Sequence, residues 1–300
     1  MAIVRRIDLP LARAVGACLR PWQRRSAARL PKKDDKIPMT LITGASRGIG
    51  AALAFELAAA GEHLLLIGQD EARLTKVCAD VLALDQGGAK DQLIVPLVLD
   101  LTAEDAIERI EAALEVHGGY VSRLLNNAGL GERDEFLAAD FDQLDQVMAV
   151  NVRALVRLTH HFLPSMIKRG EGAVVNMASI GGLAPGPYQS VYYASKAFVI
   201  SFSEALAHEL RGRGVYVGAV LPGPTKTAFH KKIGGQRAFY YWLMWKMSPR
   251  SVARSVHRAL LMRHWAVITP GPFYMLLGAA LRVIPDSLLA PFFGLLYRKW

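Results

Sequence analysis

The sequence predicts an α/β fold in which helices cover both faces of a parallel sheet. Short apolar runs without polar alternation recur along the chain, and helical stretches separate them. This pattern is typical of parallel strands that are buried on both faces. With 300 residues, the chain can bury the core of one large α/β domain or of two small domains.

Seven strands are expected between residues 37 and 269, and each is a short run dominated by apolar residues. The predicted strands are Ile37–Thr43, His63–Ile67, Leu93–Leu99, a strand that ends with Arg123–Asn126, Gly172–Ala178, Val215–Leu221 and Ala266–Thr269.

Helices are expected between these strands. Ile49–Ala60 consists mainly of small and apolar residues, whereas Thr102–His117 is acidic and amphipathic. Thr102 is the predicted N-cap of the acidic helix, with Asp105 completing a capping-box-like spacing. Asp70 is a predicted cap as well. The other predicted helices are Asp70–Leu84, Phe141–Lys168 and Ser190–Arg211.

The two cysteines indicate a reducing compartment, which we take to be the cytoplasm. Cys18 and Cys78 lie far apart and outside any metal-ligand spacing, so neither a disulfide framework nor a metal site is expected. No uninterrupted apolar run approaches the roughly 20 residues that a conventional membrane-spanning helix needs.

Charge is distributed unevenly along the chain. The net charge is +7 over residues 1–36, −7 over 37–229 and +10 over 230–300. Basic ends can bind an anionic membrane surface or nucleic acid. Leu, Ile, Phe and Trp are interleaved with the basic residues here, which favours peripheral association with a membrane, and no nucleic-acid partner is expected.

The two ends of the chain are predicted to be extensions of the domain. Residues 1–36 could form an interfacial helix, an organelle-type presequence or a disordered arm. Residues 271–300 contain the apolar runs Pro272–Leu281 and Leu288–Tyr297. Each run is too short to span a membrane but could lie in its interface. Alternatively, this tail packs on the lid expected at residues 228–248 or on a partner subunit.

Tyr192 and Lys196 lie four residues apart on a predicted helix and therefore share a face. A Lys ammonium beside a phenol favours the phenolate, which predicts a pKa for Tyr192 below its usual value of about 10. Such a phenol can exchange a proton with a substrate oxygen. On spacing alone, a solvated surface pair is the better explanation.

A glycine-rich turn follows the first predicted strand and precedes a helix, in the sequence Thr43-Gly44-Ala45-Ser46-Arg47-Gly48-Ile49-Gly50. Glycines permit a tight turn and close approach of backbone amides to a pyrophosphate, and the helix N-terminus adds a positive dipole end. The order of strand, glycines and helix therefore indicates a dinucleotide site.

Five motifs in this order resemble the short-chain dehydrogenase/reductase family over about residues 37–229, and more loosely to about 270. The resemblance implies a Rossmann-like, doubly wound sheet of about seven strands in one catalytic domain, residues 37–270. It also implies hydride exchange between a nicotinamide and a carbonyl or alcohol. The motifs are Thr43-Gly44-x-x-x-Gly48-x-Gly50, Asn126-Asn127-Ala128-Gly129, Ser179, Tyr192-x-x-x-Lys196 and Pro222-Gly223.

The resemblance implies a catalytic role for four residues. Tyr192 would be the acid/base, and Ser179 with Tyr192 would hydrogen-bond the substrate oxygen. Lys196 would bind the nicotinamide ribose and tune Tyr192. Asn151 would hold a proton-relay water, although it could instead satisfy a local backbone group.

Cofactor contacts are likewise implied by the resemblance, and Asp100 has a competing role as a helix cap. The expected residues are Gly44, Ser46, Gly48, Ile49 and Gly50 at the pyrophosphate, Asp100 at the adenine, Asn127 and Gly129 beside the sheet, Tyr192 and Lys196 at the ribose, and Pro222, Gly223, Thr225 and Thr227 at the nicotinamide amide.

NADP is favoured over NAD. An acid at the end of the second strand would repel a 2′-phosphate, but Gly68 and Gln69 stand there, and Arg47 in the glycine turn could pair with the phosphate. NAD stays open as the alternative cofactor.

An aromatic-rich segment, residues 228–248, is the expected substrate lid and suits an apolar or lipid-like ketone. Its rings could equally pack in the core or in a subunit interface. Tails similar to residues 271–300 occur in the branch of the family related to acyl-chain reductases. The rings are Phe229, Phe239, Tyr240, Tyr241, Trp242 and Trp245.

The sequence therefore predicts an NADP(H)-dependent oxidoreductase that interconverts a ketone and a secondary alcohol and forms a homo-oligomer. A catalytically silent cofactor-binding scaffold at a membrane surface is the alternative. Nucleic-acid binding through the basic ends is a third, less favoured hypothesis.

Overall fold

The computed structural model describes residues 36–83, 92–229, 244–263 and 266–297. The predicted extension 1–36, apart from Lys36, lies outside these residues. So does most of the predicted lid 228–248, including its aromatic run at 239–242.

The described part of the chain contains one sheet of seven parallel strands, in the order β3-β2-β1-β4-β5-β6-β7. The predicted fold class and strands are confirmed. Because β1 and β4 are neighbours in space but not in sequence, the winding reverses between them, and ligands of such folds bind beyond the carboxyl ends of the strands there. The strands are β1 (Ile37–Thr43), β2 (His63–Gly68), β3 (Ile94–Val98), β4 (Gly119–Asn126), β5 (Gly172–Met177), β6 (Val215–Val220) and β7 (Val267–Ile268).

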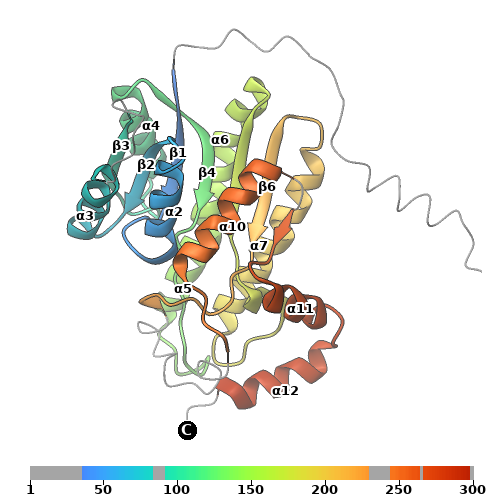
Figure 1. Cartoon of the computed structure of the whole chain (residues 1–300). Coiled ribbons are helices and arrows are strands. Elements are labelled where there is room, and N and C mark those ends of the chain that lie inside the picture. The colour runs from blue at the N-terminus through green and yellow to red at the C-terminus, as the bar shows by residue number, and fades with distance from the viewer. Residues whose placement is uncertain (1–35, 84–91, 230–243, 264–265, 298–300) are drawn as a thin grey trace, which may run out of the picture.

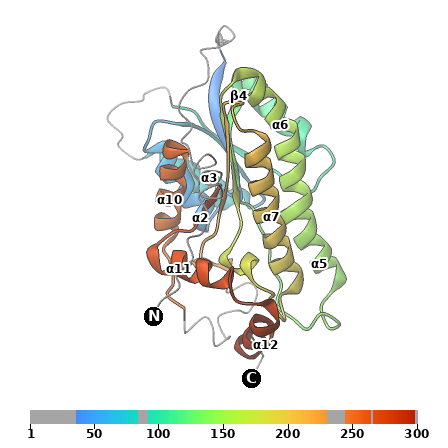
Figure 2. The same cartoon turned by 90° about the vertical axis from the view of Figure 1, so that its right-hand side faces the viewer.

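Helices cover both faces of the sheet, as Figures 1 and 2 show. Side chains of one strand alternate between the two faces: in β2, Leu64 and Leu66 pack in a different core cluster from Leu65 and Ile67. The sheet is therefore apolar on both sides. The helices are α2 (Gly48–Ala58), α3 (Glu71–Leu82), α4 (Ala106–Val116), α5 (Phe141–Met148), α6 (Leu155–Arg169), α7 (Ser190–Glu209), α10 (Pro249–Met262), α11 (Pro272–Leu281) and α12 (Asp286–Tyr297).

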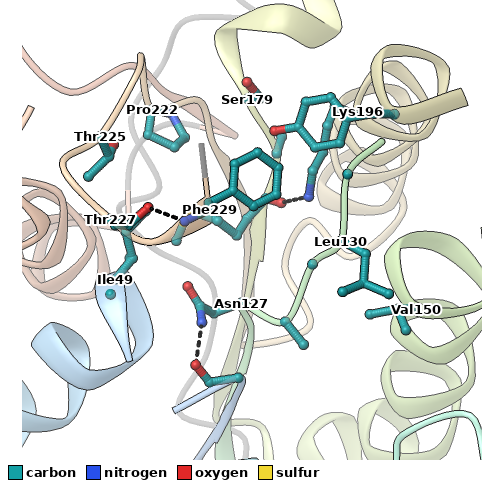
Figure 3. Close-up of a pocket in the computed structure, with 18 of the residues that line it drawn as sticks. Ile49, Asn127, Leu130, Val150, Ser179, Lys196, Pro222, Thr225, Thr227 and Phe229 are labelled. Carbon is teal, nitrogen blue, oxygen red and sulfur yellow. Dashed lines mark hydrogen bonds between the residues drawn. The ribbon is translucent and has the colours of Figure 1, made fainter. Parts of the chain in front are cut away.

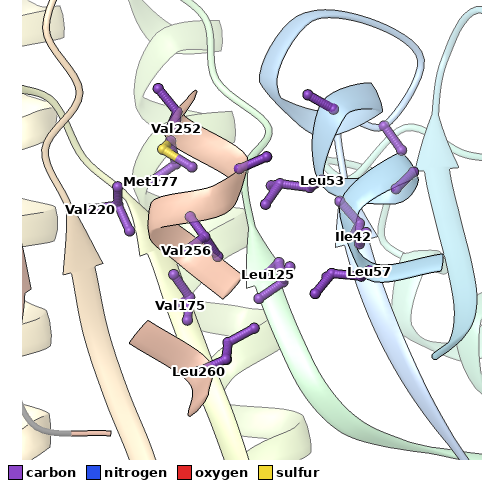
Figure 4. Packing of buried hydrophobic residues seen from close by; sticks show 14 of the residues in the cluster. Ile42, Leu53, Leu57, Leu125, Val175, Met177, Val220, Val252, Val256 and Leu260 are labelled. Atoms are coloured by element: carbon purple, nitrogen blue, oxygen red, sulfur yellow. The ribbon is translucent and has the colours of Figure 1, made fainter. Parts of the chain in front are cut away.

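Helix α10 is absent from the sequence prediction. Ser248 caps it by accepting a hydrogen bond from the Ser251 amide at 3.1 Å, and Pro249 occupies its first turn. Both are ordinary start signals. Its buried face packs in the same core cluster as Leu53 and Leu57 of α2 (Figure 4). α10 thus supports the helix that follows the glycine turn.

The predicted start of the helix after β3 is wrong. The Thr102 amide and hydroxyl both bond Asp100 Oδ1, at 2.8 and 2.7 Å, and hold Thr102 in a turn. Helix α4 begins only at Ala106. The prediction for Asp70 is confirmed, because its carboxylate accepts a hydrogen bond from the Arg73 amide at 3.1 Å.

The helix predicted over Phe141–Lys168 is interrupted by a wider turn. Between α5 and α6, Ala149–Ala154 forms a π-helical segment that contains Asn151. Such segments are rare and often occur at functional sites.

The two apolar runs near the C-terminus form α11 and α12, which lie beyond the carboxyl edge of the sheet (Figures 1 and 2). Among the described residues, no helix has both the length and the apolar character that crossing a membrane requires.

Candidate active site

A cavity of about 700 Å³ opens at the carboxyl ends of the strands, within the usual size range of ligand sites. Figure 3 shows side chains from the glycine turn, the segment after β4, α7 and the Pro-Gly loop around it. Of the predicted site residues, Gly50 and Asn151 do not line the cavity. Those that do are Gly44, Ser46, Arg47, Gly48, Ile49, Asp100, Asn127, Gly129, Ser179, Tyr192, Lys196, Pro222, Gly223, Thr225 and Thr227.

The glycine turn has a backbone that other residues would strain. Gly44 and Gly48 have φ of +66° and +60°. Gly50 packs so closely that an added Cβ would lie 2.2 Å from the Gly44 carbonyl oxygen. The turn leads into the N-terminus of α2, and this end of a helix attracts phosphate. The cradle therefore fits a pyrophosphate.

Asn127 joins the glycine turn to the end of β4. Its Nδ2 donates to the backbone carbonyl oxygen of Thr43 at 2.9 Å and to that of Gly44 at 3.3 Å (Figure 3). In return, the Thr43 hydroxyl accepts hydrogen bonds from the Asn127 and Ala128 amides, both at 3.0 Å. These bonds fix the glycine turn relative to the segment that continues into the cavity.

The Asn151 side chain hydrogen-bonds the backbone of Leu130, which is the alternative to its predicted role of holding a proton-relay water. Its Oδ1 accepts from the Leu130 amide at 2.8 Å, and its Nδ2 donates to the Leu130 oxygen at 2.9 Å and to Ser195 Oγ at 3.0 Å. An added Cβ at Gly129 would lie 3.3 Å from Lys196 Nζ and 3.4 Å from Asn151 Oδ1. The missing side chain thus leaves space beside Lys196.

Tyr192 and Lys196 lie on α7 and face the cavity together with Ser179, which follows β5. Lys196 Nζ donates to the Met177 oxygen at 2.8 Å and stands 5.8 Å from the centre of the Tyr192 ring. Ser179 Oγ accepts from the Gly181 amide at 3.1 Å, and Ser179 is close enough to the Tyr192 phenol to act on its pKa. The structure therefore brings these three predicted residues together.

The predicted fall in the pKa of Tyr192 is wrong. Desolvation by the surrounding protein raises this pKa to about 12, against the opposing hydrogen bond from Ser179 and with a further increase from the charge of Glu132. Burial lowers the pKa of Lys196 from 10.5 to about 8. At neutral pH, Tyr192 is consequently a neutral phenol, and Lys196 keeps most of its charge.

Sequence reasoning missed Glu132, whose Oε1 accepts a hydrogen bond from the Tyr192 amide at 3.0 Å. Glu132 as a whole is 8% exposed. It comes from the segment after β4 and fixes the first turn of α7. No spacing in the sequence indicates this contact, because 60 residues separate the two partners.

Asp100, Gln69 and Arg47 mark the end of the cavity near β2 and β3. Burial acts to raise the pKa of Asp100, but hydrogen bonds from Thr102 and Gln69 outweigh it and hold the pKa below its ordinary value. Gly68 lies against Ser46, where an added Cβ would stand 3.2 Å from Ser46 Cβ. Absence of a side chain at Gly68 keeps the glycine turn close to the end of β2.

The Pro-Gly loop forms the other side of the cavity. Thr225 Oγ1 donates to the Gly223 oxygen at 2.9 Å, and Thr227 Oγ1 accepts from the Phe229 amide at 3.3 Å (Figure 3). The Phe229 ring lies 5.5 Å from the Tyr192 ring. This part of the predicted lid region therefore contacts the candidate acid/base.

The motifs and the geometry agree with the comparison to protein families. The family model described as short chain dehydrogenase matches residues 38–238. The chain belongs to the short-chain dehydrogenase/reductase family. Members of this family are oxidoreductases that act on CH–OH and C=O groups.

Individual relatives and solved structures show the same likeness. The chain is 36% identical over 211 residues to an uncharacterised short-chain type dehydrogenase/reductase of Sinorhizobium fredii, covering 69% of this chain and 79% of that protein. It is 32% identical to a very-long-chain 3-oxoacyl-CoA reductase of Bos taurus, over 61% of this chain but only 57% of the bovine protein. A short-chain dehydrogenase from Sphingobium yanoikuyae, solved with NADPH, superposes with a TM-score of 0.70 at 29% identity, covering 85% of this chain and 95% of that one.

Lys196→Met should stabilise the fold at neutral pH. Lowering the pKa of Lys196 from 10.5 to about 8 corresponds to a cost of about 3 kcal/mol for the buried ammonium, which the variant removes. Loss of the bond to the Met177 oxygen offsets part of this gain.

The gain should shrink as pH rises from about 8 to 10.5, because the folded wild type then binds fewer protons than its unfolded chain and becomes more stable. Urea unfolding of the variant and the wild type at pH 7 and pH 9.5 measures the difference between their unfolding free energies. A stability difference that does not change with pH would contradict the assignment.

Proposed function

We propose that the protein is an NADP(H)-dependent oxidoreductase that interconverts a ketone and a secondary alcohol, with Tyr192 as the general acid/base. The observation that carries this proposal is the shared cavity. Ser179, Tyr192 and Lys196 line the same space as the glycine turn. A dinucleotide in the cradle would thus reach the acid/base group.

The cofactor would be held by backbone and small side chains. Gly44 and Gly48 with the N-terminus of α2 would receive the pyrophosphate. Asp100 would contact the adenine, and Thr225 and Thr227 the nicotinamide amide. When bound, the cofactor supplies or accepts the hydride.

In the reducing direction, Ser179 and Tyr192 donate hydrogen bonds to the substrate carbonyl oxygen and stabilise the charge that develops there. Tyr192 then gives its proton to this oxygen. Its raised pKa of about 12 keeps the proton available at neutral pH. The ammonium of Lys196 beside Tyr192 stabilises the phenolate that this transfer leaves behind.

NADP is the favoured cofactor because Arg47 and Gln69 line the cavity end that would hold the adenosine ribose. A guanidinium pairs well with a 2′-phosphate. Asp70 also lines this end, but it pairs with Arg73 at 3.2 Å. The Sphingobium yanoikuyae structure with NADPH supports the same choice.

An apolar or lipid-like ketone is the proposed substrate. The cavity wall beyond Tyr192 includes Phe229, Met244 and side chains of α11 and α12. The relationship to very-long-chain 3-oxoacyl-CoA reductases supports this substrate class. A solved relative described as a bulky-bulky ketone specific alcohol dehydrogenase, 25% identical with a TM-score of 0.65, supports it as well.

Peripheral membrane association is proposed from the outward side of α11 and α12. Large apolar side chains there are more than half exposed, and together they form an outer apolar face. Eleven Lys or Arg and one acidic residue in 230–300 favour an anionic lipid surface over an uncharged one. The outer apolar face consists of Phe273, Met275 and Leu276 of α11, Leu288, Phe292 and Leu295 of α12, and Val283 between the two helices.

Tyr192→Phe should slow ketone reduction because it removes the proton donor. Loss of a general acid lowers kcat by about 10²–10⁴-fold, while the affinity for NADPH should fall far less, because the glycine turn, Lys196 and the Pro-Gly loop keep their contacts. Steady-state NADPH oxidation over a range of ketones measures the first effect and fluorescence titration the second. Tyr120→Phe, at the far end of β4 beside Glu171, is the matched control. Retained activity in Tyr192→Phe would exclude the mechanism.

Arg47→Ala should weaken NADPH binding about 10- to 100-fold, the range expected for a lost hydrogen bond to a charged group, and leave NADH binding unchanged. Titration of both cofactors against wild type and variant measures the ratio. Equal losses for NADPH and NADH would show that Arg47 does not contact the 2′-phosphate.

The double variant Leu276→Asp/Leu288→Asp should lose binding to phosphatidylserine-containing vesicles in a co-sedimentation assay at low salt. Leu82→Asp/Leu261→Asp changes leucines of similar exposure on α3 and α10 (60% and 70% exposed) and should retain it. A wild-type protein that stays in the supernatant would exclude the membrane hypothesis.

A further inference from the structure

Helices α11 and α12 follow the residues matched by the family and lie beyond the carboxyl edge of the sheet (Figures 1 and 2). Both helices are apolar around most of their circumference. The outer apolar face accounts for one side. The opposite side is buried against the cavity, and its residues are absent from every motif of the sequence analysis.

The inward side of α12 repeats every four residues, at the buried Leu289 and Tyr297 and the half-buried Phe293. Leu289 and Tyr297 are each 4% exposed. Phe293 and Tyr297 line the cavity, as do Leu277 and Leu281 of α11. These four side chains are uncharged, so the wall that they form suits an apolar group.

The C-terminal end of α12 is held by two contacts near the candidate acid/base, one from α7 and one from the segment after β4. The Tyr297 hydroxyl hydrogen-bonds the Tyr193 hydroxyl, directly after Tyr192. Arg133, directly after Glu132, donates from Nη2 to the Tyr297 oxygen at 3.0 Å. The wall therefore has a fixed position relative to the reacting oxygen.

Two further contacts fix the rings of this wall. Phe293 stacks on Tyr297 with ring centres 5.8 Å apart and planes 11° apart. Tyr274 of α11 is 2% exposed, and an added Cβ at Gly223 would lie 2.2 Å from its ring. Because Tyr274 fills that space, α11 is seated directly on the Pro-Gly loop.

We propose, resting on the ketone reduction proposed above, that α11 and α12 form the substrate wall of the cavity and that Phe293 sets the size of the apolar substituent a ketone can carry. Tyr297 positions this ring through its contacts with Tyr193 and Arg133. The preferred substrate is then a ketone with one extended apolar arm that ends against Phe293.

Phe293→Ala should move the preference toward longer ketones. In a series of 2-alkanones with NADPH, the ratio of kcat/KM for long over short members should rise about tenfold, the order expected for a few methylenes of hydrophobic space. Phe292→Ala removes the same side chain from the outward side of the same helix, where it is 54% exposed. This control should leave the ratio unchanged.

Phe293→Trp should shift the ratio in the opposite direction, because the larger ring shortens the available space. Equal losses for all ketones in both Phe293 variants, or the same profile in Phe292→Ala, would overturn the assignment of Phe293. The ratio compares substrates within one variant, so a partly unfolded preparation cannot mimic either shift.

Calorimetric titration of 2-alkanones into the NADPH complex distinguishes failure of the proposed substrate wall from failure of the proposed ketone reduction. If the wild type binds ketones without turning them over, the proposed reaction is wrong. The affinity profiles of the Phe293 variants would then still decide whether α12 forms the wall. If no ketone binds, both proposals are wrong.

Discussion

The hydrogen bonds between the end of β1 and the start of the segment after β4 position the rest of the site. Asn127 and Thr43 exchange backbone and side-chain bonds at this junction, where the winding of the sheet reverses. A few residues later, the same segment is held by Asn151 at Leu130 and supports α7 through Glu132. One short stretch of chain therefore sets the distance between the glycine turn and Tyr192, the candidate acid/base. A displacement there would move both.

The two ends of the cavity are built by opposite means. At the cradle end, the chain omits side chains, and Gly44 and Gly48 adopt the positive φ of the tight turn. At the far end, it adds large rings such as Phe229 and Phe293. Between them stands Lys196, which is 4% exposed and whose ammonium costs folding free energy. The sheet core on both faces compensates for this cost, which is the usual relation between stability and a functional site.

The sequence predicted the parts of the site that depend on local chemistry. Glycines with positive φ at Gly44 and Gly48 and the spacing from Tyr192 to Lys196 can be recognised without the fold. The pKa of Tyr192 could not be predicted in this way, because it depends on the extent to which segments distant in the sequence bury the phenol. Neither could the contacts of Tyr297 at the cavity be predicted, since an apolar helix looks the same in sequence whether it faces lipid or a cavity. Thr102 illustrates a third case. Its sequence pattern predicts a helix cap, but its bonds to Asp100 hold it in a turn before the helix begins.

The π-helical segment between α5 and α6 has a consequence for how this region can change in evolution. Its wider turn accommodates one residue more than a regular helix would, and Asn151 lies inside it. A deletion from a regular α-helix rotates everything beyond it by about 100°, but the wider turn absorbs its extra residue locally. Deleting one residue from Ala149–Ala154 would therefore close the turn into regular helix and leave the buried faces of α5 and α6 in place. The change would fall on Asn151 itself and on its bonds to Leu130, so the extra residue serves the segment after β4 rather than the packing of the helix on the sheet.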